Sequence, residues 1–232
     1  IIEIAVKECN GKIPVIAGTG SNSTDEAVEL SQYAEKAGSD ALLVVTPYYN
    51  KPTQEGLYQH YKKINDSVGI PIIIYNIPSR SVIDMSVETM SKLYELKNIT
   101  GVKDATGDLN RVDQQLKAMG KDFIQLTGND DNALEFNKRG GVGAIGVTAN
   151  IAAKRSSDFQ KACEQKSKAA ESLDKLLQPL HSALFIESNP SPVKYAASLL
   201  GMCNPSVRLP LVEIREETKK KVSEALKVAK LL

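Results

Sequence analysis

Two residues at the ends of apolar runs could together carry out carbonyl chemistry. Lys103 ends an apolar run that starts at Ile99, and Tyr75 ends an earlier run that starts at Ile70. A lysine at the edge of an apolar core loses hydration, which lowers its pKa and frees the amine as a nucleophile. Such an amine attacks carbonyls to form a Schiff base, and a nearby phenol can relay the protons. In a second interpretation Lys103 reaches solvent or pairs with Asp104.

Histidine and cysteine usage argues against other kinds of site. His60 and His181 each lack a second histidine or cysteine at ligand spacing. We therefore expect no zinc or non-haem iron site, no other metal and no cofactor. Cys9, Cys163 and Cys203 are odd in number and far apart in helical patterns. This pattern is typical of small core residues in a reducing compartment, which favours the cytoplasm.

The length and charge of the chain limit the number of domains and the kinds of partner that we expect. Its 232 residues suffice for one large domain or two small ones. The formal net charge is +1, and the basic residues are spread over helix-like segments, so we expect no nucleic-acid partner. No apolar run is long enough to span a bilayer and no signal peptide opens the chain, so we expect no membrane partner.

The first residues predict a helix already under way. Apolar residues at positions 1, 2, 4, 5 and 9 fit the buried stripe of a helix, although no methionine or capping residue precedes them. We expect the back half of an element whose beginning has been lost.

Short apolar runs predict six strands. None of the runs alternates cleanly between apolar and polar residues, as is typical of parallel strands covered on both faces. Helix patterns separate them, and Ser23-Thr24-Asp25-Glu26 is expected to be the capping box of one such helix. The six runs are residues 14–17, 41–45, 70–75, 99–103, 123–126 and 142–147.

Six β-α units indicate either a doubly wound sheet or a barrel. Gly18-Thr19-Gly20-Ser21 lacks the glycine spacing of a dinucleotide-binding turn. Polar and aromatic residues follow nearly every strand, where barrel active sites lie, so a barrel is favoured. We predict an α/β fold, a (β/α)₈ TIM barrel truncated at its N-terminus to six visible strands. Residues 1–150 form the partial barrel, and residues 151–232 form its last helix and a C-terminal helical domain.

Five runs spread over the whole chain closely resemble the dihydrodipicolinate synthase (4-hydroxy-tetrahydrodipicolinate synthase) family. This resemblance implies a barrel enzyme that condenses pyruvate with L-aspartate-4-semialdehyde, the first committed step of lysine biosynthesis through diaminopimelate. It also implies a homo-oligomer, a tetramer built as a dimer of dimers. The runs are residues 15–22, 45–52, 75–80, 101–108 and 189–194.

The resemblance assigns the catalytic roles. Lys103 is expected to form the Schiff base with pyruvate, and Tyr75 to be the general acid and base. Tyr49 is the second aromatic of the proton relay and reaches into a neighbouring subunit. Arg80 is expected to bind a substrate carboxylate, a task that suits its rigid guanidinium fork.

The resemblance also assigns binding residues. Gly128 and Ile145 are expected to line the pyruvate pocket, and Asn76 is expected among the substrate-binding residues. A site for lysine as an inhibitor is expected at Asn22, Glu26 and Tyr48, where acidic Glu26 suits a ligand with an ammonium group.

Single residues have alternative interpretations. Tyr48 and Tyr49 could be packing aromatics at the root of a loop, Arg80 a solvated loop charge, and Glu26 part of a helix cap.

Two departures from the family pattern affect the expectation. Ser81-Val82 follows Arg80 where the family usually has Thr-Gly, which restricts the backbone there. The family's first two strands and first helix have no counterpart here, nor does a threonine pair that completes the proton relay. Alternatives are therefore another pyruvate-dependent aldolase, of the N-acetylneuraminate lyase or keto-deoxy-sugar type, or a catalytically impaired fragment that acts as a structural module. The arginine at position 80 favours the synthase.

Overall fold

The computed structural model describes all 232 residues, which divide into two compact units. The first unit contains residues 1–128 and 139–142, and the second contains residues 129–138 and 143–232. None of the helices has the length and apolar character needed to cross a lipid bilayer.

Six strands form a sheet in chain order, which confirms the predicted number of strands. Each of β1 to β4 pairs in parallel with the next strand along the chain. The last strand is only two residues long, so the prediction of a strand over residues 142–147 was too long. The strands are β1 (Ile16–Gly18), β2 (Ala41–Val45), β3 (Ile72–Asn76), β4 (Ile99–Asp104), β5 (Ile124–Thr127) and β6 (Gly143–Ala144).

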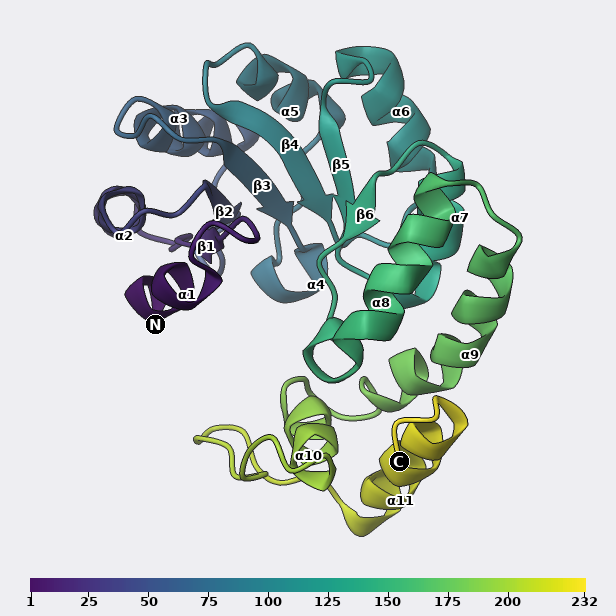
Figure 1. The fold of residues 1–232 in the computed structure, drawn as a ribbon. Coiled ribbons are helices and arrows are strands. Elements are labelled where there is room, and N and C mark those ends of the chain that lie inside the picture. Colours follow the sequence, from purple (N-terminus) through teal and green to yellow (C-terminus); the bar gives the residue numbers. More distant parts are fainter. The chain divides into compact units, whose positions relative to one another are not determined.

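Helices of the first unit follow one another along the sheet, and α2, α3, α5 and α6 each lie next to the following one (Figure 1). Thr53 and Ser86 cap α3 and α5, because each hydroxyl accepts a bond from a backbone N–H in the first turn. The fully buried core between sheet and helices includes Leu42, Leu57 and Ile74. The helices are α1 (Ile2–Cys9), α2 (Thr24–Lys36), α3 (Gln54–Asn65), α4 (Pro78–Ser81), α5 (Val87–Tyr94) and α6 (Asn110–Met119).

The first helix exists, but its predicted buried stripe was wrong at Ile1 and Ile4. No residue of α1 is fully buried, and Ile4 is 66% exposed. The partly buried positions are 2, 5, 6 and 9, the spacing of one helical face. On this face Val6 lies near Gly38, just after α2. Ile1 and Ile4 fall outside it and face solvent.

The predicted capping box at α2 was also wrong. Ser23 is the N-cap residue, but its side chain makes no capping hydrogen bond. The hydroxyl of Ser21 instead accepts a bond from the Ser23 backbone N–H, at 3.1 Å, and donates to the carboxylate of Glu26. Ser21 therefore occupies the donor that Glu26 would have bonded in a capping box.

The second unit is helical apart from β6. Its core gathers apolar residues such as Leu180, Ala196 and Leu226. Asp130 accepts bonds from the backbone N–H groups of Val147 and Thr148, at 2.7 and 2.9 Å, just before α8 begins. Helices α8 and α9 pack side by side (Figure 1). The elements are the 3₁₀ turn η1 (Asp130–Asn132), α7 (Ala133–Lys138), α8 (Ala149–Glu164), α9 (Ala169–Ala183), α10 (Ser191–Leu199) and α11 (Glu216–Val228).

Candidate active site

Lys103 and Tyr75 lie opposite each other on neighbouring strands. The parallel ladder pairs Tyr75 with Lys103 and Asn76 with Asp104. The Lys103 Nζ atom lies 3.8 Å from the centroid of the Tyr75 ring, within the range of a cation–π contact. Lys103 is 9% exposed, so its amine lies in a mostly dry environment. The structure thus brings together the two residues predicted to form and protonate a Schiff base.

A register shift produces this pairing. Ile72 pairs with Ile99, but Ile73 pairs with Gly101, so Thr100 is an extra residue on β4. The Thr100 hydroxyl bonds to the Ile72 carbonyl at 3.3 Å. Without the shift Tyr75 would lie opposite Val102, because a one-residue slip moves each side chain to the other face of the sheet. The bulge therefore aligns the amine with the phenol.

The environment of Tyr75 favours its protonated form. Burial raises the pKa of the Tyr75 phenol above its ordinary value of 10, and the nearby positive charge of Arg80 offsets part of this rise. The phenol therefore carries its proton at neutral pH and can donate it to a reacting oxygen.

A cleft of about 370 Å³ opens beside Tyr75 in the first unit. Tyr48 and Arg80 line it together with Tyr75, so three of the predicted site residues meet there. Apolar side chains and two glycines supply most of the remaining wall. These further residues are Gly18, Gly20, Leu43, Val45, Ile77 and Ser81.

Arg80 is held in the cleft by a short helix. It belongs to α4, and the residue that caps the C-terminus of this helix, Val82, is in the left-handed region with φ 63°. A β-branched residue adopts this conformation only with strain, whereas glycine adopts it freely. The buried Ser81 hydroxyl lies 2.9 Å from the carbonyl oxygen of Ile77 and 3.0 Å from that of Ile83. Ser81 therefore contacts the carbonyl groups on both sides of this turn and holds it in place.

Gly128 lies directly beside the Lys103 side chain. Its backbone N–H donates to the Asp104 carbonyl at 2.7 Å. A Cβ atom at this position would lie 2.6 Å from the Ala105 Cβ and 3.1 Å from the Lys103 Cε. Only glycine leaves space beside the amine here. Ile145, the other residue expected in the pyruvate pocket, follows β6 in the second unit and is half-buried.

Asn76 is completely buried, and both ends of its amide have protein partners. Its Nδ2 donates to Asp84 Oδ1 at 2.7 Å, and its Oδ1 accepts from the Met85 backbone N–H at 3.0 Å. The amide thus fastens the end of β3 to the loop before α5. A substrate contact by Asn76 stays a prediction.

Tyr49 does not line the cleft. It is 84% exposed, and its φ of 76° places it in the left-handed region. Tyr48, next to it, is 41% exposed and does line the cleft. A role for Tyr49 in the relay therefore stays a prediction.

The residues expected to bind lysine lie close to this loop. The Asn50 amide donates to the Asn22 carbonyl at 3.0 Å, which joins the start of α2 to the segment that contains Tyr48. Glu26 is exposed, and its carboxylate accepts the bond from Ser21.

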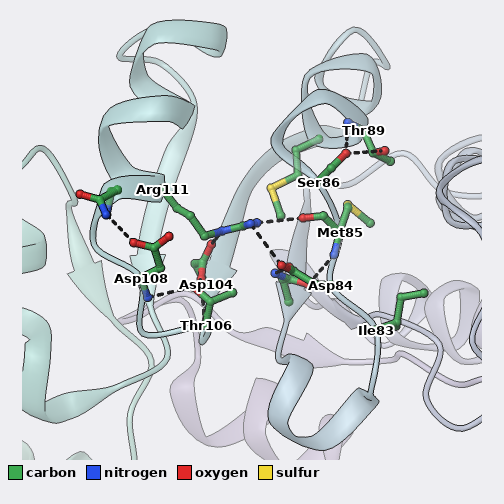
Figure 2. Close-up of polar contacts among 12 residues, drawn as sticks. Ile83, Asp84, Met85, Ser86, Thr89, Asp104, Thr106, Asp108 and Arg111 are labelled. Atoms are coloured by element: carbon green, nitrogen blue, oxygen red, sulfur yellow. Dashed lines mark hydrogen bonds and ion pairs between the residues drawn. The ribbon is translucent and has the colours of Figure 1, made fainter.

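Asp104 is bonded to Arg111, and this pair was not foreseen. The Arg111 Nε donates to Asp104 Oδ2 at 2.9 Å (Figure 2). The sequence offered one weak signal, an acidic residue at a strand end followed seven positions later by an arginine at the start of a helix.

A parallel sheet with a lysine and a tyrosine at adjacent strand ends defines the class of β/α-barrel enzymes with their site at the carboxyl ends of the strands. The model of the dihydrodipicolinate synthetase family matches residues 1–229. The chain therefore belongs to this family, as the resemblance predicted.

Relatives and solved structures agree with this assignment. The chain is 70% identical over 237 residues to the 4-hydroxy-tetrahydrodipicolinate synthase of Pelagibacter ubique, covering all of this chain and 80% of that protein. It is 58% identical to the synthase of Bradyrhizobium diazoefficiens, covering all of this chain and 79% of that one.

Among solved structures, a chloride-inhibited synthase from Acinetobacter baumannii complexed with pyruvate matches with a TM-score of 0.97 and 44% identity, covering 100% of this chain and 80% of that one. A synthase from Cyanidioschyzon merolae with lysine bound matches with a TM-score of 0.92 and 34% identity, covering 98% and 78%. These matches confirm the predicted barrel-type fold, six strands with a helical C-terminal part.

Proposed function

We propose that the protein condenses pyruvate with L-aspartate-4-semialdehyde through a Schiff base on Lys103, giving 4-hydroxy-tetrahydrodipicolinate for lysine and diaminopimelate biosynthesis. Family membership supports the overall reaction. The observation that carries the mechanism is the position of the Lys103 amine, 3.8 Å from the centre of the Tyr75 ring at a strand end.

In the first step the Lys103 amine attacks the carbonyl carbon of pyruvate, a C–N bond forms, and the carbonyl oxygen leaves as water. Tyr75 donates the proton that this oxygen needs, because its phenol is protonated at neutral pH. The Tyr75 phenolate left by this step accepts a proton from the pyruvate methyl group, which gives an enamine. The enamine carbon attacks the aldehyde of the second substrate, and the aldehyde oxygen takes up a proton to become a hydroxyl. The α-amino group of the second substrate then attacks the imine carbon, the C–N bond to Lys103 breaks, and the ring product leaves the free lysine amine.

Arg80 supports selection of the second substrate. It lines the cleft beside Tyr75, and a guanidinium there can bind a carboxylate with two parallel hydrogen bonds. This arrangement favours an aldehyde with a carboxylate, such as aspartate semialdehyde, over a neutral sugar aldehyde.

Borohydride trapping tests the nucleophile. Borohydride added with pyruvate should reduce the imine and add mass to the peptide that contains Lys103, while Lys103→Arg should abolish labelling. The chain should be compared with an extended version that adds the residues of the Pelagibacter ubique relative not covered by this chain, since the match covers 80% of that relative. Label on another lysine, or none on the extended version, would contradict the proposal.

We further propose that free lysine binds at Asn22, Glu26 and Tyr48. The bond between Asn50 and Asn22 joins the two segments that carry these residues, and exposed Glu26 is available to an ammonium group. Calorimetry should show heat at millimolar lysine that Glu26→Gln removes. Without such heat, Glu26 keeps only its bond to Ser21. The family resemblance also supports a cytoplasmic homo-oligomer, which sedimentation can measure.

A further inference from the structure

We propose that Arg111 is a positioning residue for the Schiff-base reaction. Its guanidinium bonds directly to Asp104, which follows Lys103. It also bonds to the Asp84–Met85 loop, which in turn holds Asn76, the residue after Tyr75. This inference rests on the proposed function, because it concerns the geometry between these two residues.

The first half of the network fixes Asp104, the last residue of β4. Arg111 Nε and Gln115 Nε2 both donate to Asp104 Oδ2, at 2.9 and 3.0 Å. Asp104 Oδ1 accepts from the backbone N–H and the hydroxyl of Thr106, at 2.9 and 2.6 Å. The Asp104 and Arg111 side chains are only 5% and 11% exposed. Four donors in a buried site therefore hold this carboxylate in one position.

The second half reaches the end of β3. Arg111 Nη2 donates to the Met85 carbonyl at 2.8 Å, and Nη1 lies 3.5 Å from Asp84 Oδ2. Asp84 and Met85 in turn hold both ends of the Asn76 amide, next to Tyr75. Figure 2 shows Arg111 between Asp104 on one side and the Asp84–Met85 loop on the other.

The Arg111 network and the reacting amine of Lys103 lie on opposite faces of the sheet. Lys103 and Asp104 are consecutive in a strand, so their side chains point to opposite faces of the sheet. Arg111 therefore acts on the reacting pair through the backbone that follows Lys103 and through the loop bonded to Asn76. Its planar fork donates in several fixed directions at once, which a lysine ammonium on a flexible stem does not reproduce.

Imine formation depends on an accurate position of the Lys103 amine. Attack on a carbonyl requires the reacting atoms in a near-attack geometry, and an error of about 1 Å costs roughly 10²-fold in rate. The bulge at Thr100 places Lys103 opposite Tyr75, and the Arg111 network fastens the strand ends beyond that bulge. Loosening the network should therefore slow imine formation more than it weakens pyruvate binding.

The test uses Arg111→Lys, which keeps the charge and loses the fork. We expect the rate constant of borohydride-trapped imine formation at Lys103 to fall by about 10-fold or more, with the pyruvate concentration at half-maximal rate changed by less than about 3-fold. Asn98→Ala is the matched control, since Asn98 is buried at the opposite end of β4 and bonded to Asn65 and Val68. The Asn98→Ala variant should be less stable than the wild type but should form the imine at Lys103 at the same rate.

Asp84→Asn provides a second variant in case Arg111→Lys does not fold. The Asp84 side chain is 50% exposed, so the protein should tolerate the change. We expect a rate between those of the wild type and Arg111→Lys. If Arg111→Lys does not fold, an unchanged rate in Asp84→Asn refutes the role.

The outcomes separate the two proposals. If neither the wild-type chain nor its extended version shows label at Lys103, the proposed function itself fails, and the role of Arg111 fails with it. If the wild type is labelled and Arg111→Lys is labelled as fast, only the role of Arg111 is refuted. Equal rate losses in Arg111→Lys and Asn98→Ala at equal loss of stability would also refute it, because Arg111 would then be merely structural.

Discussion

Gly128→Ala should disturb the site by a predictable amount. The new Cβ would lie 2.6 Å from the Ala105 Cβ, whereas carbon atoms in contact are about 3.5–4.0 Å apart. The Ala105 Cβ is fixed by its backbone, so the two segments must separate by about 1 Å. Gly128 has no positive φ, so alanine introduces overpacking without backbone strain. Overpacking of this kind costs about 1–3 kcal/mol of stability.

The same displacement should slow the reaction. The Lys103 Cε lies 3.1 Å from the new Cβ, so the amine moves with the crowded segment. A shift of about 1 Å predicts a loss of roughly 10²-fold in the rate of imine formation. Urea unfolding measures the stability, and borohydride trapping with pyruvate measures the rate.

A compensating variant tests the cause. In Gly128→Ala combined with Ala105→Gly the 2.6 Å contact disappears, and the Ala105 Cα at 3.4 Å and the Lys103 Cε at 3.1 Å remain. Stability should return nearly to that of the wild type, and the rate should recover in part. Wild-type stability and rate in Gly128→Ala alone would refute the packing argument. A double variant that is no more stable and no faster than Gly128→Ala would refute it too.

Three further predictions concern other residues. Tyr75→Phe should lower turnover by ~10²-fold or more without unfolding the protein, as steady-state kinetics and circular dichroism would show; near-normal turnover would leave Tyr75 a packing residue. Arg80→Ala should reduce turnover of aspartate semialdehyde far more than that of a neutral aldehyde, and equal losses would remove its carboxylate role. Burial lowers the pKa of His60 from 6.5 to about 4, so the unfolded chain takes up the proton first. Stability present above pH 6.5 should therefore fall by about 3 kcal/mol as the pH drops toward 4, and His60→Gln should flatten this dependence in urea titrations.

The strands were predictable because of how they are buried. A parallel strand that is covered on both faces has a nearly continuous run of apolar residues. The runs that end at Tyr75 and Lys103 are of this kind. Their pairing was not predictable in detail. The extra residue Thr100 determines which side chain lies opposite Tyr75. One unpaired residue does not change the pattern of apolar residues, so the bulge could not be predicted from the sequence.

Local polar contacts were harder to predict. The Ser23–Glu26 pattern matches a capping box, yet the Ser23 backbone N–H bonds to Ser21, and the Ser23 hydroxyl makes no capping bond. Arg111 was missed for a related reason, since its partners Asp104 and Asp84 are 7 and 27 positions away. Which of several polar side chains meets a given donor depends on three-dimensional packing, and sequence spacing constrains it only within a helical turn or two.

Strand pairing in chain order has a consequence for motion. In the first unit β1 has three residues and pairs only with β2, and Ile16 on it is 40% exposed. By contrast, Ile74 on β3 and Val102 on β4 are completely buried. Opening of β1 breaks no hydrogen bond between β3 and β4, so we expect β1 amides to exchange with deuterium through small local fluctuations, and amides near Tyr75 and Lys103 only through much larger ones. The reacting pair would then stay assembled while β1 opens and closes.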